Sequence, residues 1–155
     1  MKLLVFSDSH GSPARMLRAI TQEKPDMIIH LGDGGREISE IERQFPQTEL
    51  KAVRGNCDIC SVLPESEFFR IGKTKFFITH GHNYGVKWTL STLIEEAAAR
   101  GANFVMFGHT HVAHFSTASG IYVLNPGSCG PSPAPSYAEI ILDETNEPAC
   151  RIVRF

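Results

Sequence analysis

The chain has 155 residues, a length typical of one globular domain that buries a core without covalent staples. Its composition, 42% hydrophobic and 21% charged, excludes a disordered chain. The formal net charge of −2 gives no overall attraction for duplex DNA, so affinity for an anionic substrate must be created locally.

The N-terminal segment, residues 1–8, has one basic residue and an apolar run of only four residues. This run is too short for the core of a signal peptide or for a membrane span. We therefore expect residues 2–7 to be the first strand, in a cytoplasmic protein with no membrane partner.

The cysteines fit that location, because reduced thiols are the rule in the cytosol. There are four, namely Cys57, Cys60, Cys129 and Cys150. The C-x-x-C spacing of Cys57 and Cys60 leaves a zinc or redox pair open. However, a second such pair is absent, and the flanking residues predict a strand exit and a loop rather than the start of a helix.

Apolar periodicity predicts alternating strands and helices in the first half of the chain, and this alternation favours parallel pairing. Ser12 is expected to be a helix N-cap followed by Pro13 at the first helical position. The expected elements are strands at 2–7, 26–31, 50–53, 68–71 and 75–79 and helices from Ser12-Pro13 to about 24 and at 34–45, with a hairpin across Gly72-Lys73.

The second half opens with a predicted helix over 86–100, where apolar residues repeat at helical spacing and Gly101 follows as a C-cap. Strands are expected at 103–107, 112–117, 121–124, 137–142 and 150–155. The last four have short connections, which favours antiparallel pairing. The whole chain, 1–155, is thus expected to be a single mixed α/β domain. Residues 126–135, with four prolines, are expected to be an ordered loop, either a surface connector or a wall of a substrate site.

Polar side chains follow five of the predicted strands where they end. They are Asp8 and His10, Asp33, Asn56 with Asp58 close behind, His80 with His82, and His109 with His111. Ligands of α/β sheets bind beyond the carboxyl ends of the strands. Carboxylates and imidazoles gathered in one crevice need a cation to be stable together. Their oxygen and nitrogen donors suit manganese, iron or zinc.

Leaving aside Asp58 and His82, seven such donors remain, which are too many for one ion but suit two ions that share a bridging carboxylate. Two divalent ions against two carboxylates leave a positive site, which attracts an anion such as phosphate. His30 lies inside a predicted strand and is expected to be a packed core histidine. His114 is expected to face solvent or the rim.

The ordered set D-S-H, G-D, G-N-C-D, T-H-G-H and G-H-T-H resembles the calcineurin-like metallophosphoesterases, above all their small single-domain bacterial and archaeal phosphodiesterases. The resemblance runs from Lys2 to about Ser128 and includes N-P-G-S at 125–128. It implies an α/β four-layer sandwich of two mixed β-sheets flanked by helices.

The resemblance also implies the metal ligands. One ion would be held by Asp8, His10, Asp33 and His111. The other would be held by Asp33, Asn56, His80 and His109, with Asp33 as the bridge. Manganese is the usual ion in this family, with zinc, nickel, iron and magnesium also reported. The implied reaction is direct attack of a metal-bridging hydroxide on phosphorus.

Three further residues receive roles from the same resemblance. Asp58 would orient its neighbours, and with Asn56 and His82 it is placed among the catalytic residues. Cys57 stands where larger relatives have a histidine that protonates the leaving group. A thiol is a poor acid for that step, so His82 is the alternative, and both residues are assigned to the substrate side.

The leading interpretation is a binuclear metal-dependent phosphodiesterase that acts on a small phosphate ester. The alternatives are a phosphomonoesterase, a nuclease, for which a basic groove is missing, and a non-catalytic metal-binding scaffold like the retromer sorting subunit of eukaryotes. Trp88, Tyr84 and Phe115 are expected to pack, or else to shape a substrate pocket or the contact of a homodimer or higher homo-oligomer.

Overall fold

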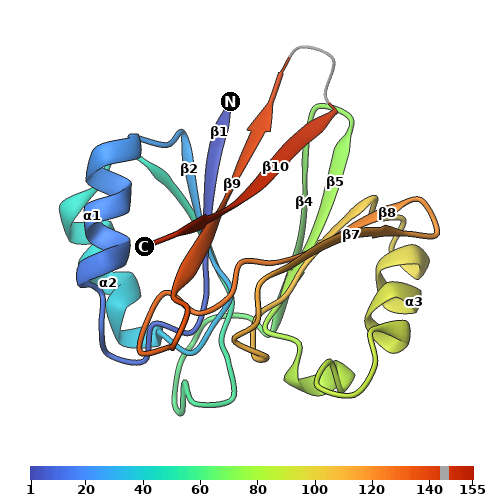
Figure 1. Ribbon diagram of the computed structural model, residues 1–155, viewed down its shortest axis with the longest axis horizontal. Helices are drawn as coiled ribbons and strands as arrows, with labels where there is room; N and C mark the ends of the chain where they lie inside the picture. The colour runs from blue at the N-terminus through green and yellow to red at the C-terminus, as the bar shows by residue number, and fades with distance from the viewer. Residues whose placement is uncertain (144–146) are drawn as a thin grey trace.

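The computed structural model of the protein describes residues 1–143 and 147–155. Within these ranges two five-stranded sheets and three α-helices form the fold (Figure 1). The elements in chain order are β1 (Lys2–Phe6), α1 (Ala14–Glu23), β2 (Met27–His30), α2 (Gly35–Gln44), β3 (Glu49–Ala52), β4 (Ser66–Ile71), β5 (Thr74–Thr79), the 3₁₀ turn η1 (His82–Tyr84), α3 (Ser91–Ala99), β6 (Phe104–Met106), β7 (His114–Ala118), β8 (Ile121–Asn125), β9 (Ser136–Leu142) and β10 (Pro148–Arg154).

Both sheets are mixed. In the first sheet, with strand order β10-β9-β1-β2-β3, strands β1, β2 and β3 are parallel, and β9 is antiparallel to both β1 and β10. In the second sheet, with order β4-β5-β6-β8-β7, strands β5, β6 and β8 are parallel, and the edge strands β4 and β7 are antiparallel to their neighbours. The prediction of antiparallel pairing for the late strands is therefore wrong for one side of β8.

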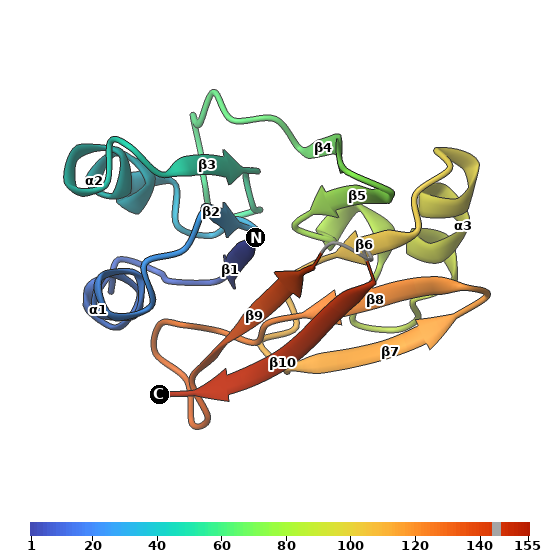
Figure 2. The ribbon, with the colours of Figure 1, turned by 90° about the horizontal axis from the view of Figure 1, so that it is seen from above.

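The layers are those of a four-layer sandwich. Helices α1 and α2 cover the outer face of the first sheet, and α3 covers the outer face of the second (Figures 1 and 2). The alternation of strand side chains explains this arrangement. In β1, Leu3 and Val5 enter the core between the two sheets, whereas Leu4 and Phe6 pack toward α1 and α2. The expected fold is confirmed.

Two helix starts differ from the prediction. Helix α3 begins at Ser91 and not at Val86, because the preceding segment turns around Gly85, whose φ is +61°, and the hydroxyl of Thr89 accepts the N–H of Ser91. The apolar face was nonetheless predicted correctly, since Val86 packs in the same cluster as the helix. The N-cap of α1 is Pro13 and not Ser12, and no side chain caps that end.

Strands β1, β2, β3, β5 and β6 deliver their carboxyl ends to one edge of the sandwich, the lower edge in Figure 1. This common edge places the polar segments that follow them beside one another. Across the described residues, every helix is too short or too polar to traverse a bilayer.

Candidate metal centre

Asp8 follows β1 and is fully buried at the meeting point of the two sheets. Its Oδ2 accepts the hydroxyl of Ser7 at 2.6 Å and the N–H of His109 at 3.1 Å. Its Oδ1 is buried without a hydrogen-bond partner among the described residues, and it lies 3.1 Å from Nε2 of His111 and 3.9 Å from Nε2 of His10. One carboxylate oxygen is thus fixed, and the other is left facing imidazoles.

Asp33 follows β2, and its two carboxylate oxygens also have different surroundings. Its Oδ1 accepts the N–H of Cys57 at 2.8 Å. Its Oδ2 lies 3.4 Å from Nε2 of His80 and 3.9 Å from Nε2 of His10. His10 therefore stands within 4 Å of both carboxylates, which makes Asp8 and Asp33 two sides of one centre.

The backbone at the centre adopts an uncommon conformation. Eight non-glycine residues in the described ranges have positive φ, and five of them belong to the expected ligand set, namely Asp8, His10, Asp33, His109 and His111. Such left-handed residues cost free energy and persist where the surrounding structure imposes them, which happens most often at functional sites.

Glycine is required where the backbone approaches Asp33. A Cβ on Gly55 would collide with the Asp33 carboxylate, and one on Gly32, with φ +98°, would lie 2.6 Å from the nitrogen of Gly55. The G-D and G-N pairs of the sequence therefore bring β2 and β3 close enough for both to serve the same centre.

Proximity shifts the titration of the central groups. Burial by itself favours neutral Asp33, but the His80 ring and the N–H of Cys57 hold the pKa of this carboxyl well below its ordinary value. Burial favours neutral His80 as well, yet Asp33 and Asp8 raise its pKa. His109, which is desolvated and close to charged His80 and Lys87, has its pKa lowered to about 4.

The structure gathers most of the expected ligands into two groups whose donor atoms lie within 4.8 Å of one another. One contains Asp8, His10 and His111, and the other contains Asp33, His80 and His109. Asn56 adjoins them from the loop after β3, between Gly55 and Cys57, whose N–H groups are bound by Asp58 and Asp33.

Asp58 lies behind the centre and organises the backbone. Its Oδ2 accepts the N–H groups of Asp33 and Gly55, both at 2.8 Å, and its Oδ1 accepts those of Gly34 and Gly35 at 3.0 and 2.7 Å. Since Gly35 opens α2, the carboxylate also satisfies donors at the start of that helix. It thereby ties the ends of β2 and β3 together.

His82 borders the centre on the other side. Its ring lies 5.5 Å from that of His80 and 6.1 Å from that of His109, measured between centroids. Burial and the neighbouring His80 lower its pKa, so His82 is neutral at neutral pH. Its Nδ1 is buried and makes no hydrogen bond to any described residue.

Three supporting residues received no individual role from the sequence. Ser7 binds Asp8, Asn125 donates to the carbonyl oxygen of Gly108 at 2.8 Å, and Ser128 donates to the carbonyl oxygen of Asp8 at 2.9 Å. The N-P-G-S segment was the available signal for the last two. The first half of the proline-rich loop is thus buried against the centre and is not a surface connector.

The remaining histidines and the rim residues behave differently from one another. His30 is buried in β2 and accepts the N–H of Gly32 at 3.2 Å, as expected of a core histidine. His114 is half-buried at the start of β7 and contacts Ser116, so the expectation of a solvent-facing ring is only partly met. The packing expectation is wrong for Trp88, which is 91% exposed, whereas Tyr84 packs in the cluster under α3.

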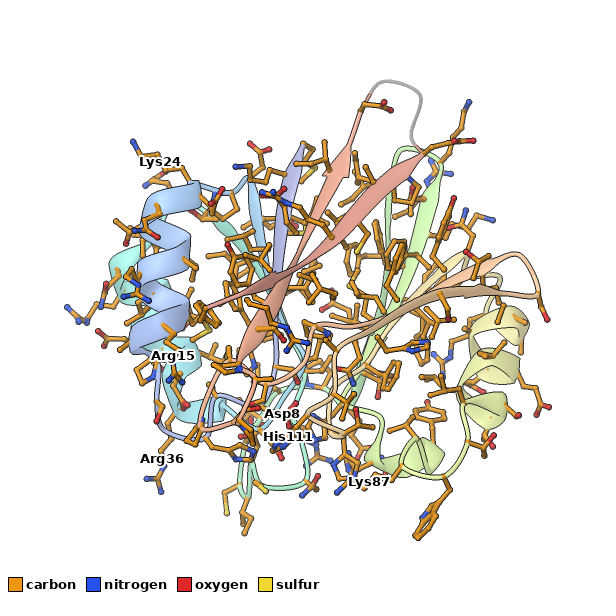
Figure 3. All side chains as sticks on the ribbon, viewed as in Figure 1. Asp8, Arg15, Lys24, Arg36, Lys87 and His111 are labelled. Atoms are coloured by element: carbon orange, nitrogen blue, oxygen red, sulfur yellow. The ribbon has the colours of Figure 1, made fainter. Side chains whose placement is uncertain are left out.

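A cavity of about 760 Å³ opens beside the centre, between the start of α2 and the loop after β3. His10, Asp33 and Cys57 line it on the side of the centre, and Arg36 and the apolar side chains of Ile59 and Val62 form part of its other walls. In Figure 3, Asp8 and His111 lie between Arg36 on one side and Lys87 on the other. Cations therefore flank a centre that is itself rich in histidine.

Comparison with known proteins agrees with this geometry. The protein-family model described as "Calcineurin-like phosphoesterase superfamily domain" matches residues 1–147 of the chain. The chain belongs to this family. It is 35% identical over 131 residues, 83% of its length and 75% of the relative's, to the "Probable metallophosphoesterase YsnB" of Bacillus subtilis.

A second relative and a solved structure extend the likeness. The "Phosphodiesterase MJ0936" of Methanocaldococcus jannaschii is 29% identical over 147 residues, which cover 83% of this chain and 84% of that protein. The structure of Vps29 from Entamoeba histolytica complexed with zinc superposes with a TM-score of 0.80 over 99% of both chains at 23% identity, which shows a shared fold.

Proposed function

We propose that the chain is a single-domain, binuclear metal-dependent phosphodiesterase that acts on a small phosphate ester. The observation that carries this proposal is the convergence of two buried carboxylates and four imidazoles from separate strand ends, with donor atoms left unpartnered. The name of the M. jannaschii relative supports the reaction class. The assigned ligands are Asp8, His10, Asp33, Asn56, His80, His109 and His111.

The donor set fits divalent metal ions. Burying Asp8 Oδ1 and His80 Nε2 without hydrogen bonds costs free energy that a bound cation would offset. We assign the two donor groups, Asp8 with His10 and His111 and Asp33 with His80 and His109, to two metal positions. Asp33 would also complete the first position, and Asn56 would complete the second. Nitrogen and oxygen donors of this kind suit manganese, zinc, nickel or iron, and less often magnesium.

When bound, such ions lower the pKa of water and polarise phosphoryl oxygens, which is the chemistry that phosphodiester hydrolysis needs. The protein's own residues then position these groups. Asp58 fixes the backbone of Asp33 and Gly55, and Ser7 orients Asp8. His82, held neutral beside His80 and His109, is assigned to the substrate, to which its ring can offer a hydrogen bond. Cys57 is exposed and lines the cavity.

The test is turnover of an activated aryl phosphodiester and of the matching phosphomonoester, each with manganese, magnesium, zinc or a strong chelator. We expect metal-dependent hydrolysis with preference for the diester, abolished in Asn56→Ala. Preference for the monoester would indicate a phosphomonoesterase instead. Metal binding without turnover of either ester would favour a scaffold, and full activity in the chelator would refute the metal centre.

A further inference from the structure

Cys57 is exposed, lines the cavity and lies beside the proposed ligands. Its Sγ forms a third group of donor atoms within 4.8 Å of one another, together with His10 and Asp33. His10 also belongs to the group with Asp8 and His111, and Asp33 belongs to the group with His80 and His109. The sulfur therefore lies beside one proposed ligand from each of the other two groups.

The backbone of Cys57 is held beside Asp33. The N–H of Cys57 donates to Asp33 Oδ1 at 2.8 Å, which fixes its Cα next to the carboxylate. The side-chain amide of Asn56 donates to Sγ at 3.2 Å. An N–H directed at sulfur favours an electron-rich sulfur, as in a thiolate, over a thiol that must itself find an acceptor.

The Asp33 carboxylate, which belongs to the same donor group as the sulfur, attracts a cation, and the thiolate is the form of cysteine that binds metal. Among the described residues, Asp8 Oδ1 and His80 Nε2 are buried without a hydrogen-bond partner, and they belong to the two neighbouring donor groups. They independently indicate that cations bind beside His10 and Asp33.

We propose that Cys57 is an additional metal ligand of the ion held by His10 and Asp33. On binding, the bond between Sγ and the metal forms, the S–H bond breaks, and the proton passes to solvent. This inference rests on the proposed metal centre and replaces the substrate contact expected of Cys57. Because a thiolate is a soft donor, it makes this position selective for zinc or cobalt over manganese or magnesium.

Spectroscopy of the cobalt-loaded protein tests the inference directly, without reference to catalysis. The metal-free full chain is titrated with Co²⁺, and absorption is recorded in the near ultraviolet, where sulfur-to-cobalt charge transfer gives an intense band. We expect the band in the wild type and in Cys60→Ser, and its loss in Cys57→Ser. Cys60 is the matched control, because it lines the same cavity but belongs to none of the three donor groups.

Metal affinities give a second readout. Cys57→Ser is expected to weaken Zn²⁺ binding about tenfold or more and to change Mn²⁺ binding little, in line with the effect of removing groups around a metal. Circular dichroism of the metal-free variants shows whether the fold is retained. Cobalt binding without the band, or a band that survives in Cys57→Ser, would overturn the inference and leave the metal centre standing. Failure of the wild type to bind any of these ions would refute the proposed function as well.

Discussion

His80 presents Nε2 to Asp33 Oδ2 at 3.4 Å, while its opposite nitrogen, Nδ1, lies 2.7 Å from the carbonyl oxygen of Leu31. A carbonyl oxygen can only accept, so Nδ1 carries a proton and donates it to Leu31. In the neutral ring Nε2 then holds a lone pair that points to the centre. This is the tautomer that a metal-binding histidine needs, and the segment that follows β2 supplies both Asp33 and the carbonyl group that selects it.

Replacement of His80 by alanine is expected to lower the number of tightly bound metal ions per chain and to reduce phosphodiesterase activity by about 100-fold or more, because even an outer partner of a metal ligand is worth 10–100-fold. Metal content after dialysis and steady-state rates measure the two effects. The control is His114→Ala, which removes a histidine whose observed contact is with Ser116. Equal losses in the two variants would contradict the assignment.

Removal of the Asp58 carboxylate tests the backbone support. Asp58→Ala removes the acceptor of four backbone N–H groups, those of Asp33, Gly34, Gly35 and Gly55. We expect metal affinity to fall about 10–100-fold and unfolding free energy to fall by about 1–3 kcal/mol. Calorimetric titration and urea unfolding measure these changes. Asp58→Asn keeps the shape and one acceptor oxygen, so its losses should be smaller; unchanged metal affinity in Asp58→Ala would show that Asp58 has no positioning role.

The strand ends were predictable because each follows a short apolar run, and such runs are visible in a single sequence. Asp8 and Asp33 were placed correctly at the ends of β1 and β2 for this reason. Their burial was not predictable, since it depends on the second sheet closing over the first. The hydrogen bonds of Asn125 and Ser128 join segments far apart in the chain, and no local pattern specifies them.

The start of α3 shows the opposite limit. Val86 continues the apolar face of the helix, so periodicity alone extends the helix to that residue. The start of the helix is set by the hydrogen bond between Thr89 and Ser91 and by the positive φ of Gly85. Neither feature interrupts the apolar periodicity of the sequence. The periodicity of apolar residues therefore predicts the packed face of a helix more reliably than it predicts where the helix begins.

The pH dependence of stability should reveal buried His30. The N–H of Gly32 donates to its Nδ1, and its Nε2 contacts the hydroxyl of Ser9, which donates to Glu37. Burial lowers the pKa of His30, although the nearby carboxylates oppose this effect. The folded state therefore prefers the neutral ring. Its contribution is fully present above the unfolded pKa of about 6.5 and is lost as the pH falls toward the folded pKa.

Below about pH 6.5, the unfolding free energy of the wild type should thus fall more steeply than that of His30→Gln, by up to about 1.4 kcal/mol per pH unit. Urea unfolding from about pH 8 to about pH 5 measures both slopes. His30→Gln is expected to be less stable at every pH, because the bond from Gly32 is lost, but only the difference in slope bears on the titration. Parallel curves would show that the pKa of His30 is the same in the folded and the unfolded protein.

Lys87 is expected to attract the anionic substrate without taking part in the reaction. Its charge contributes to the lowered pKa of His109, so it lies within electrostatic reach of the centre, and it stands on the same edge as Asp8 and His111 (Figure 3). Lys87→Gln should raise KM up to about fivefold, the size of one exposed ion pair, and leave kcat unchanged. Because salt screens exposed charges, the effect should fade at high ionic strength. Lys24→Gln, a change at the opposite end of the molecule in Figure 3, is the control. A similar rise in KM for Lys24→Gln, or a fall in kcat for Lys87→Gln, would argue against local steering by Lys87.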